Sequence, residues 1–285
     1  MPPMNPAPDI PNRLTVSIVL YESSLDLLKR AIASLDRAAR IAREPASLAR
    51  VDVELVDNST TQAYRTQAAE LAAGWTSDDF FQLSYTAVRG NRGFGAGHNH
   101  VIQNLDSTFH LVLNPDVELS PDALVVGLTA LRDDTGVALV SPRVTGDGGR
   151  QEFLCKRYPS VLVLLLRAFA PRFIRRVFQR RLGRYEMRDV CTGSGEAEVM
   201  LASGCFMLVR SDAIRAAGGF NEGYFLYFED FDLSLRLGGQ GRLIFNPAVH
   251  IMHHGGYAAS KGMLHLKYFL RSGITFFNQH GWRWI

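Results

Sequence analysis

Short apolar runs alternate with stretches of helical period along the first half of this 285-residue chain. The run Leu14–Leu20 is nearly continuous and rich in β-branched residues, and Leu25, Leu28 and Ile32 then recur at helical spacing. Similar strand-like runs follow at 51–56, 82–87, 109–113 and 137–141. Continuous apolar runs are typical of parallel strands that are buried on both faces. The alternation predicts an α/β fold with a single, mostly parallel central sheet flanked by helices.

Polar residues stand directly after two of these predicted strands. Asp57 and Asn58 follow the second strand, and Asn114 and Asp116 follow the fourth, with a proline between them that fixes the turn. The carboxyl ends of parallel strands are where open α/β sheets bind ligands. Asn and Asp also cap helices and close turns. For the group at Asp57 both interpretations stay open, and a single turn aspartate such as Asp116 is more often structural.

Glycine and basic residues are concentrated in the segment RGNRGFGAGHNH, from Arg89 to His100. This segment does not match the dinucleotide-binding pattern G-x-G-x-x-G, because after Gly93 and Gly95 the last position holds His98. It also follows the third predicted strand, whereas the dinucleotide pattern follows the first. An NAD-dependent enzyme is therefore disfavoured. A glycine-rich loop that opens a helix still allows close approach to a phosphate.

The stretch Gly218–Arg236 places three acids beside a dense run of aromatic residues. Its sequence predicts a helix with Glu229 and Asp230 in the first turn and with Asp232 and Arg236 as an i,i+4 ion pair. Nearby aromatic side chains remove water from a carboxylate, which raises its pKa towards that of a general base. The alternative is that these residues are helix-start acids without a catalytic role.

Composition is that of a soluble globular protein, with 47% hydrophobic and 21% charged residues. The net charge of +3 at pH 7 is too small to indicate nucleic acid as a partner. Three separated cysteines, without metal-ligand spacing, predict reduced thiols in a cytoplasmic protein. Residues 1–13 are proline-rich and predict a disordered arm without the features of a signal peptide. No apolar run approaches the length of a membrane span.

Arginine residues crowd into the segment 161–188, interleaved with apolar side chains. This pattern resembles an interfacial amphipathic helix, for which an anionic membrane surface would be the partner. A solvated basic face over a packed apolar face explains it equally well. The aromatic residues in 257–285 recur at helical spacing, which predicts a C-terminal helical segment that packs over the sheet or faces a membrane. His250, His253 and His254 cluster near the end of a predicted strand, where structural histidines are commoner than metal ligands.

Seven motifs occur together and in one order along nearly the whole chain after the N-terminal arm. They are VDNS (56–59), GNRGFGAGHN (90–99), LNPDVEL (113–119), RYPS (157–160), SGCFMLVR (203–210), GGFNEGYFLYFEDFDLSLRL (218–237) and HHGG (253–256). Each is weak alone, and the ordered set resembles family 2 glycosyltransferases of the rhamnosyltransferase-like branch, which build bacterial surface polysaccharides.

The resemblance implies the GT-A nucleotide-sugar-binding fold, inverting chemistry and a divalent cation, Mg²⁺ or Mn²⁺. Asp230 occupies the place of the catalytic base, with Glu229 as its partner. Asp116 and His253 occupy the places of the metal ligands. The donor-binding positions implied are Tyr21, Glu22, Asp57, Asn58, Asn91, Arg92, Gly93, Asn114 and Asp116.

Two departures from the family pattern stand out. The usual Thr-Tyr-Asn after the first strand is Leu20-Tyr21-Glu22, which indicates a different base pocket. The usual D-x-D is Asn114-Pro115-Asp116, with one acid where two are expected, which indicates a weaker metal site.

The resemblance also implies a domain organisation and a function. A GT-A domain would span 14–256, with a nucleotide-sugar half at about 14–150, a basic insertion at 161–188 and an acceptor half at about 190–256. The predicted activity is transfer of a sugar, with dTDP-L-rhamnose as the expected donor, to a lipid-linked or oligosaccharide acceptor. The predicted location is the cytoplasm, with peripheral attachment to the inner membrane face left open, as is the oligomeric state. The alternative is a non-catalytic nucleotide-sugar- or carbohydrate-binding module, which would have no need of a base such as Asp230.

Overall fold

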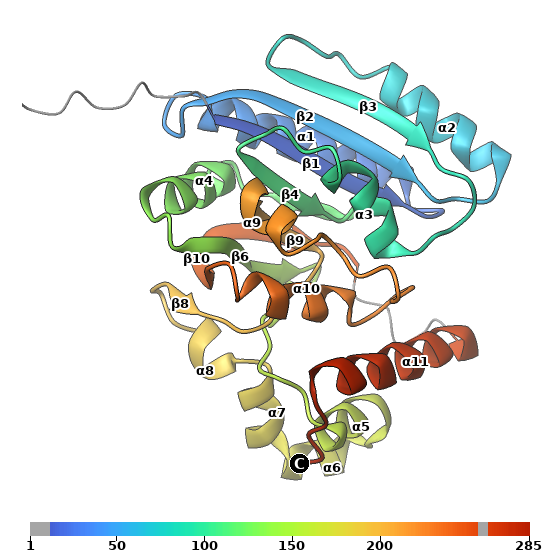
Figure 1. Ribbon diagram of the computed structural model, residues 1–285, viewed down its shortest axis with the longest axis vertical. Coiled ribbons are helices and arrows are strands. Elements are labelled where there is room, and N and C mark those ends of the chain that lie inside the picture. Colours follow the sequence, from blue (N-terminus) through green and yellow to red (C-terminus); the bar gives the residue numbers. More distant parts are fainter. Residues whose placement is uncertain (1–11, 256–261) are drawn as a thin grey trace, which may run out of the picture.

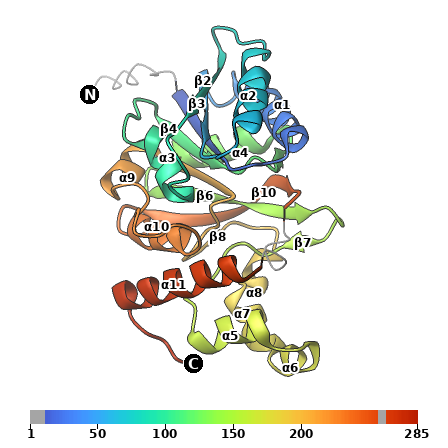
Figure 2. The same cartoon turned by 90° about the vertical axis from the view of Figure 1, so that its right-hand side faces the viewer.

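The computed structural model describes residues 12–255 and 262–285, and its centre is a ten-stranded sheet with helices on both faces (Figures 1 and 2). The strands are β1 (Asn12–Leu20), β2 (Leu48–Asp57), β3 (Phe81–Ala87), β4 (Phe109–Leu113), β5 (Val117–Leu119), β6 (Val137–Gly146), β7 (Gln151–Glu152), β8 (Ala197–Glu198), β9 (Phe206–Arg210) and β10 (Arg242–His253). The helices are α1 (Leu25–Ala42), α2 (Gln62–Ala73), α3 (Phe94–Ile102), α4 (Ala123–Asp133), α5 (Val161–Phe169), α6 (Arg172–Val177), α7 (Gln179–Tyr185), α8 (Arg188–Cys191), α9 (Ser211–Ala216), α10 (Glu229–Leu237) and α11 (Gly262–His280). The predicted N-terminal arm lies outside the described residues, apart from Asn12 and Arg13, which begin β1.

The sheet is mostly parallel, as the sequence predicts. Its strand order is β3-β2-β1-β4-β9-β6-β10-β5, and the first four strands run parallel, as do β6 and β10. Strand β9 is antiparallel to both of its neighbours, β4 and β6. It begins at Phe206, directly after a turn at Gly204 and Cys205. Leu201, before this turn, forms an isolated bridge with Lys156.

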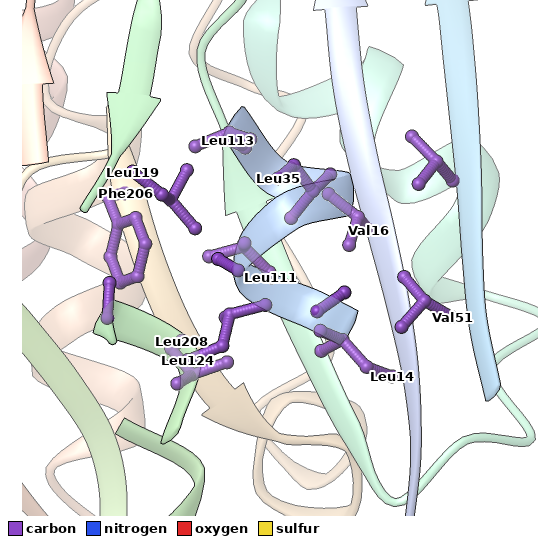
Figure 3. Packing of buried hydrophobic residues seen from close by; sticks show 14 of the residues in the cluster. Leu14, Val16, Leu35, Val51, Leu111, Leu113, Leu119, Leu124, Phe206 and Leu208 are labelled. Carbon is purple, nitrogen blue, oxygen red and sulfur yellow. The ribbon is translucent and has the colours of Figure 1, made fainter. Parts of the chain in front are cut away.

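Two hydrophobic clusters cover the two faces of the sheet. Helices α1, α2 and α4 pack on one face, where β1 contributes Leu14, Val16 and Ile18. Figure 3 shows Leu35 of α1 among the side chains of Val16, Leu111 and Leu113. Helices α3, α9 and α10 pack on the other face. Each of these leucines is fully buried, and such burial stabilises the fold by about 1.5–3 kcal/mol per side chain.

A buried polar network joins α3 to the strands beneath it. The Ser17 hydroxyl lies 2.6 Å from Nδ1 of His98 and 3.0 Å from Nε2 of His110. Burial lowers the pKa of both imidazoles, so both are neutral inside the core. His98 is therefore a core residue that anchors α3 to β1 and β4. This role explains why a histidine stands where the dinucleotide-binding pattern would have its last glycine.

The glycine-rich loop is pressed against the loop that precedes the acidic helix. The backbone N–H of Phe94 donates to the Phe225 carbonyl at 3.2 Å. Gly93 has φ of +92°, and a Cβ atom there would lie 2.3 Å from the same carbonyl oxygen. Glycine is required at this position on both counts, because the backbone conformation and the close approach each exclude a side chain. Two segments about 130 residues apart in sequence are thereby held together.

The arginine-rich segment does not form the single amphipathic helix that its pattern suggests. It folds as four short helices, α5 to α8, at the end of the molecule remote from β3 (Figures 1 and 2). Pro171 ends α5 because it has no N–H to donate, and Ala170 before it is extended, with ψ of 133°. Phe178 forms the second break, between α6 and α7. Among residues 12–255 and 262–285, no helix is long and apolar enough to cross a membrane.

The C-terminal helix α11 packs on α10 and the loop before it, and not over the sheet. Phe276 and Phe277 of α11 join Tyr224 and Phe228 in a third buried cluster. The predicted Asp232–Arg236 ion pair is confirmed at 2.6 Å, and the other Asp232 oxygen lies 2.8 Å from Nε2 of His280. The start of α10 is thus fixed from two sides, by the glycine-rich loop and by α11.

The contact at Gly93 makes a prediction about stability. Gly93→Ala should destabilise the fold by about 3 kcal/mol or more, because it adds a clash to the cost of an unfavourable backbone conformation. Gly90→Ala is the matched control: Gly90 also has positive φ, of +72°, but a Cβ atom there would have no neighbour within 4 Å. It should lose only about 1–2 kcal/mol. Urea denaturation of both variants measures the difference, and equal losses would contradict the role assigned to the Phe225 contact.

Candidate active site

The acidic end of α10 is held in a strained backbone. Tyr227 and Phe228, the two residues before the helix, both have positive φ, of 71° and 66°. Neither residue is a glycine, so each of these backbone conformations costs on the order of 1–3 kcal/mol of folding free energy. Contacts with surrounding residues must therefore hold them in place. Phe228 is buried in the aromatic cluster with Phe276, and the Tyr227 hydroxyl lies 2.9 Å from Nδ1 of His265 on α11. The strain fixes where Glu229 and Asp230 point.

Asp230 points to the turn that precedes β9. Its Oδ2 accepts a hydrogen bond from the Gly204 N–H at 3.0 Å, and its Oδ1 accepts one from the Phe231 N–H at 2.9 Å. Burial raises the pKa of this carboxyl group, and the two N–H donors partly offset that rise. The side chain is half-buried, so the carboxylate is both reachable and partly desolvated.

Glu229 differs from its neighbour in having no such support. Its side chain is buried, and its Oε2 has no hydrogen-bond partner among the described residues. Burial, and then the charge of Asp230, raise the pKa of Glu229 to about 8. Hydrogen bonds from N–H groups stabilise the ionised form of a carboxyl group, and Asp230 has two of them whereas Glu229 lacks such side-chain support. At neutral pH the pair therefore consists of an ionised Asp230 and a neutral Glu229.

The Glu229 environment predicts a pH dependence of stability. The folded-state pKa lies above the unfolded value, so the stabilising contribution is complete below about pH 4.5 and is lost as pH rises through about 8. The variant Glu229→Gln has no carboxyl group to ionise at this position, so it does not lose stability in this way as pH rises. Relative to wild type, its free energy of unfolding should rise between pH 5 and 8, by up to about 1.4 kcal/mol per pH unit. Thermal denaturation across this range measures it.

Glu198→Gln, on the exposed strand β8, is the control, and its difference from wild type should stay constant over the same range. A Glu229→Gln difference that is also constant with pH would show that Glu229 is ionised in the folded protein.

A second group of acidic and basic side chains lies on the other side of the β9 turn. Oδ1 of Asp116 lies 3.7 Å from Nε2 of His253, and Nδ1 of His253 lies 3.1 Å from Oε2 of Glu152. Glu152 can accept the Nδ1 proton, which leaves the Nε2 lone pair facing Asp116. A carboxylate behind a histidine in this way is the usual outer support of a metal-ligating imidazole.

Asp116 and His253 have the chemistry of a partial metal site. Within the described residues no three or more His, Cys, Asp and Glu side chains form a cluster that could hold a metal ion. The pair nevertheless offers one oxygen and one nitrogen ligand, and Oδ1 of Asp116 is buried without a hydrogen-bond partner in the described chain. A buried carboxylate oxygen without a donor is suited to a cation. The pair fits a divalent ion that takes its remaining ligands from a bound diphosphate and water.

The two groups meet at Cys205. The Cys205 carbonyl accepts the Asn114 N–H at 2.9 Å, and the preceding Gly204 N–H donates to Asp230. Burial raises the pKa of the Cys205 thiol to about 12, with smaller contributions from the charges of Asp116, Asp230 and Glu152. Three segments that are far apart in sequence thus place an acid near this turn.

The structure uses several predicted donor-binding residues as supports. Glu22 accepts hydrogen bonds from the Thr60 and Thr61 N–H groups, at 3.2 and 3.1 Å, and so holds the turn that leads into α2. Asp57 is fully buried, and its oxygens accept from the Ser59 N–H at 2.8 Å and the Tyr85 hydroxyl at 2.7 Å. These carboxylates shape the carboxyl edge of β1 and β2, where direct contact with a nucleotide stays a prediction.

Of the remaining donor-binding candidates, two support the glycine-rich loop and two are exposed. Asn58 is buried and donates to the Gly93 carbonyl at 2.9 Å, and Asn91 accepts the Gly93 N–H at 2.9 Å, so both set the glycine-rich loop. Arg92 forms an exposed ion pair with Glu222 at 3.0 Å. Tyr21 is 52% exposed at the end of β1, which makes its ring available for stacking.

Sequence patterns did not indicate three residues of this site. Glu152 comes from the two-residue strand β7, which pairs with β6 and carries no motif. Gly204 contributes only its backbone N–H. Lys156 is buried, which lowers its pKa to about 8, and its charge acts on the Asp230 carboxyl. The RYPS motif begins at the next residue, Arg157, and does not include the lysine.

Comparison with known proteins agrees with this architecture. Residues 15–215 match the family described as Glycosyl transferase family 2. The match covers more than half of the chain, and the chain belongs to this family.

Two curated relatives are rhamnosyltransferases by name. The chain is 28% identical over 191 residues to N-acetylglucosaminyl-diphospho-decaprenol L-rhamnosyltransferase of Mycobacterium tuberculosis, which covers 60% of this chain and 58% of that protein. It is 28% identical over 174 residues to rhamnosyltransferase WbbL of Escherichia coli K12, which covers 56% of this chain and 61% of the relative. The matches thus span about three-fifths of the length of these relatives.

Solved structures show the same fold at low sequence identity. A mannosyltransferase from Pyrobaculum calidifontis in complex with GDP-Man and Mn²⁺ has a TM-score of 0.62 and 16% identity, over 97% of this chain and 67% of that one. GalNAc-T7 with UDP, GalNAc and Mn²⁺ has a TM-score of 0.60 and 13% identity, over 87% of this chain and 44% of that one. The fold is that of GT-A glycosyltransferases, as the motif resemblance implied.

The Glu152–His253 contact predicts an effect on metal affinity. Glu152→Gln should weaken Mn²⁺ binding in the presence of a nucleoside diphosphate by about 10–100-fold, because the imidazole loses the carboxylate that orients it. Glu118→Gln is the control, since Glu118 lies 2.7 Å from Nε2 of the neighbouring His254, which is not one of the proposed metal ligands. Calorimetric titration of Mn²⁺ measures both variants, and equal affinities in the two would rule out this role for Glu152.

Proposed function

We propose that this chain transfers a sugar from a nucleoside diphosphate sugar to an acceptor hydroxyl with inversion at the anomeric carbon. The observation that carries the proposal is the arrangement around Gly204 and Cys205, with an ionised Asp230 on one side and the Asp116–His253 pair on the other. A displacement at a sugar diphosphate requires a base at the acceptor and a group that carries the charge of the departing diphosphate. The arrangement supports the proposal because it offers a candidate group for each of these two roles.

Asp230 acts as the general base in this proposal. Its carboxylate takes the proton of the acceptor hydroxyl as that oxygen attacks the anomeric carbon, and the bond to the diphosphate breaks. The Gly204 and Phe231 N–H groups hold the carboxylate in one orientation. Glu229 keeps its proton and so adds no second negative charge that would raise the pKa of Asp230 beyond use.

Asp116 and His253 would hold Mg²⁺ or Mn²⁺, with His253 oriented by Glu152. The cation, when bound, neutralises charge on the diphosphate leaving group. The nucleoside would lie along the carboxyl edge of β1 and β2. Tyr21 is available to stack on the base, and Asp57, Asn58, Asn91 and Gly93 would shape the pocket. Arg92 and Asn114 are proposed to contact the donor.

The names of the relatives support a proposal for the donor sugar and for the acceptor. L-rhamnose from dTDP-L-rhamnose is the proposed donor, because both curated relatives are named as rhamnosyltransferases. A lipid-linked acceptor is proposed because one of them is named for a diphospho-decaprenol substrate. Peripheral attachment to the inner face of the cytoplasmic membrane would bring the chain to such an acceptor. Exposed apolar side chains on α5 and α6 support this attachment: Leu165, Phe169, Phe173 and Val177.

The assignment of Asp230 is tested by a pair of isosteric variants. Asp230→Asn should lower turnover by about 10²–10⁴-fold and leave donor binding intact, because it removes the base and keeps the shape. Glu229→Gln should keep turnover within about tenfold of wild type, because Glu229 is already neutral.

The assay is release of nucleoside diphosphate from a panel of nucleotide sugars with Mg²⁺ or Mn²⁺, in the presence of acceptor, with donor binding followed by thermal shift. Greater loss in Glu229→Gln than in Asp230→Asn would transfer the base role to Glu229. Donor binding without release from any sugar of the panel would favour a binding module over an enzyme.

A further inference from the structure

A hollow of about 960 Å³ lies between the helices of the basic segment, and arginine residues line much of it. These are Arg167 of α5, Arg172, Arg175 and Arg176 of α6, and Arg188 of α8. They come from three separate helices, so the break of the segment into short helices is what turns the side chains towards a common space. The hollow is remote from β1 and β2 and takes no part in the proposed nucleotide pocket (Figure 2).

The charges in this hollow are unbalanced. Glu186 is the acid among the lining residues, and it already pairs with Arg188 at 2.6 Å and lies 3.7 Å from Arg167. Arg172, Arg175 and Arg176 form no ion pair with any acid in the described part of the chain. Like charges that converge without a counter-charge repel one another. Guanidinium groups in such a cluster are well suited to the paired oxygens of phosphates.

Apolar side chains stand beside the charges. Phe173 and Val177, which also line the hollow, are 69% and 76% exposed. A site for a soluble phosphate has no use for exposed aromatic and aliphatic surface, whereas a phosphate on a hydrocarbon chain would cover it. The combination therefore matches an amphiphile with an anionic head and an apolar tail.

Arg167, which lines the hollow, contacts a tyrosine that senses the charge of Asp230. The Arg167 guanidinium lies over the ring of Tyr185, 5.4 Å from its centroid, and Tyr185 is buried. The pKa of the Tyr185 hydroxyl is raised by burial and responds to both the Arg167 and the Asp230 charge. Tyr185 thus contacts an arginine of the hollow and also senses the charge of Asp230.

We propose that this arginine-lined hollow binds the diphosphate of a lipid-linked acceptor, with the acceptor sugar extending towards Asp230 and the hydrocarbon chain covering Phe173 and Val177. This inference rests on the proposed glycosyl transfer to a lipid-linked acceptor, and it names the surface that recognises the lipid end. Two negatively charged phosphates would replace the missing counter-charges of Arg172, Arg175 and Arg176.

The test compares two triple variants of the full chain. Arg172→Gln, Arg175→Gln and Arg176→Gln together remove charge from the hollow. Arg180→Gln, Arg181→Gln and Arg184→Gln together remove the same charge from exposed arginines of the same segment that do not line it. The probe is farnesyl diphosphate, with farnesol and inorganic pyrophosphate as partial probes, titrated by calorimetry. Wild type should bind farnesyl diphosphate more tightly than either partial probe.

The hollow-lining variant should lose about tenfold or more in affinity for farnesyl diphosphate, and the control variant less than about threefold. Equal losses in the two variants would overturn the proposal, as would pyrophosphate binding as tightly as farnesyl diphosphate. Co-sedimentation with phosphatidylglycerol vesicles identifies the source of the phosphate. If the hollow-lining variant lost vesicle binding but kept farnesyl diphosphate affinity, the hollow would be a headgroup site and the proposal wrong.

Acceptor-independent release of nucleoside diphosphate separates this proposal from the proposed function. The hollow-lining variant should release it at the wild-type rate, because the donor pocket is built from other segments. If wild type bound farnesyl diphosphate through the hollow but released no nucleoside diphosphate from any donor, the proposed glycosyl transfer would be wrong and the proposed binding site would be supported. If release were normal and farnesyl diphosphate did not bind, the proposed binding site would be wrong and the proposed glycosyl transfer would be unaffected.

Discussion

The turn at Gly204 and Cys205 is the interaction on which the site depends. Its Gly204 N–H holds Asp230, and its Cys205 carbonyl holds the backbone of Asn114, two residues before Asp116. The turn can do this because β9 runs antiparallel between β4 and β6, which brings its first residues to the carboxyl edge of β4. If β9 ran parallel to β4, its first residues would lie at the opposite edge of the sheet, away from Asn114. The reversed strand therefore creates the junction between the two halves of the site.

Rigidity around this turn is obtained by packing. Tyr227 and Phe228 occupy left-handed conformations that cost free energy, and α11 compensates with the aromatic cluster and with the His280 contact to Asp232. On the opposite side, Gly93 allows the glycine-rich loop to touch the Phe225 carbonyl. The acidic helix start is thus enclosed by two loops and one helix. Enclosure also desolvates the carboxyl groups, so one arrangement positions the proposed base, Asp230, and raises its pKa.

Much of this was visible in the sequence, for identifiable reasons. The apolar runs predicted the strands correctly, because a strand that is buried on both faces needs a continuous run of hydrophobic residues. The i,i+4 spacing of Asp232 and Arg236 correctly predicted an ion pair. The aromatic run before Glu229 indicated desolvation, and both carboxyl groups show it. Predictions from local pattern were wrong where contacts distant in sequence decide the structure.

The pattern of the basic segment suggested one helix, because periodicity takes no account of the helix break at Pro171. Glu152 was missed because a two-residue strand has no pattern, and the support roles of Glu22 and Asp57 depend on partners distant in sequence.

The central claim is that Asp230 serves a single direct displacement at the anomeric carbon. The most direct test is the stereochemistry of the product, followed by proton NMR of the anomeric signal during transfer from the nucleotide sugar that the enzyme accepts. One displacement with Asp230 as base predicts that the new glycosidic bond has the anomeric configuration opposite to that of the donor. Retention of the donor configuration would require a second displacement or an internal return, and would contradict Asp230 as the base of a single displacement.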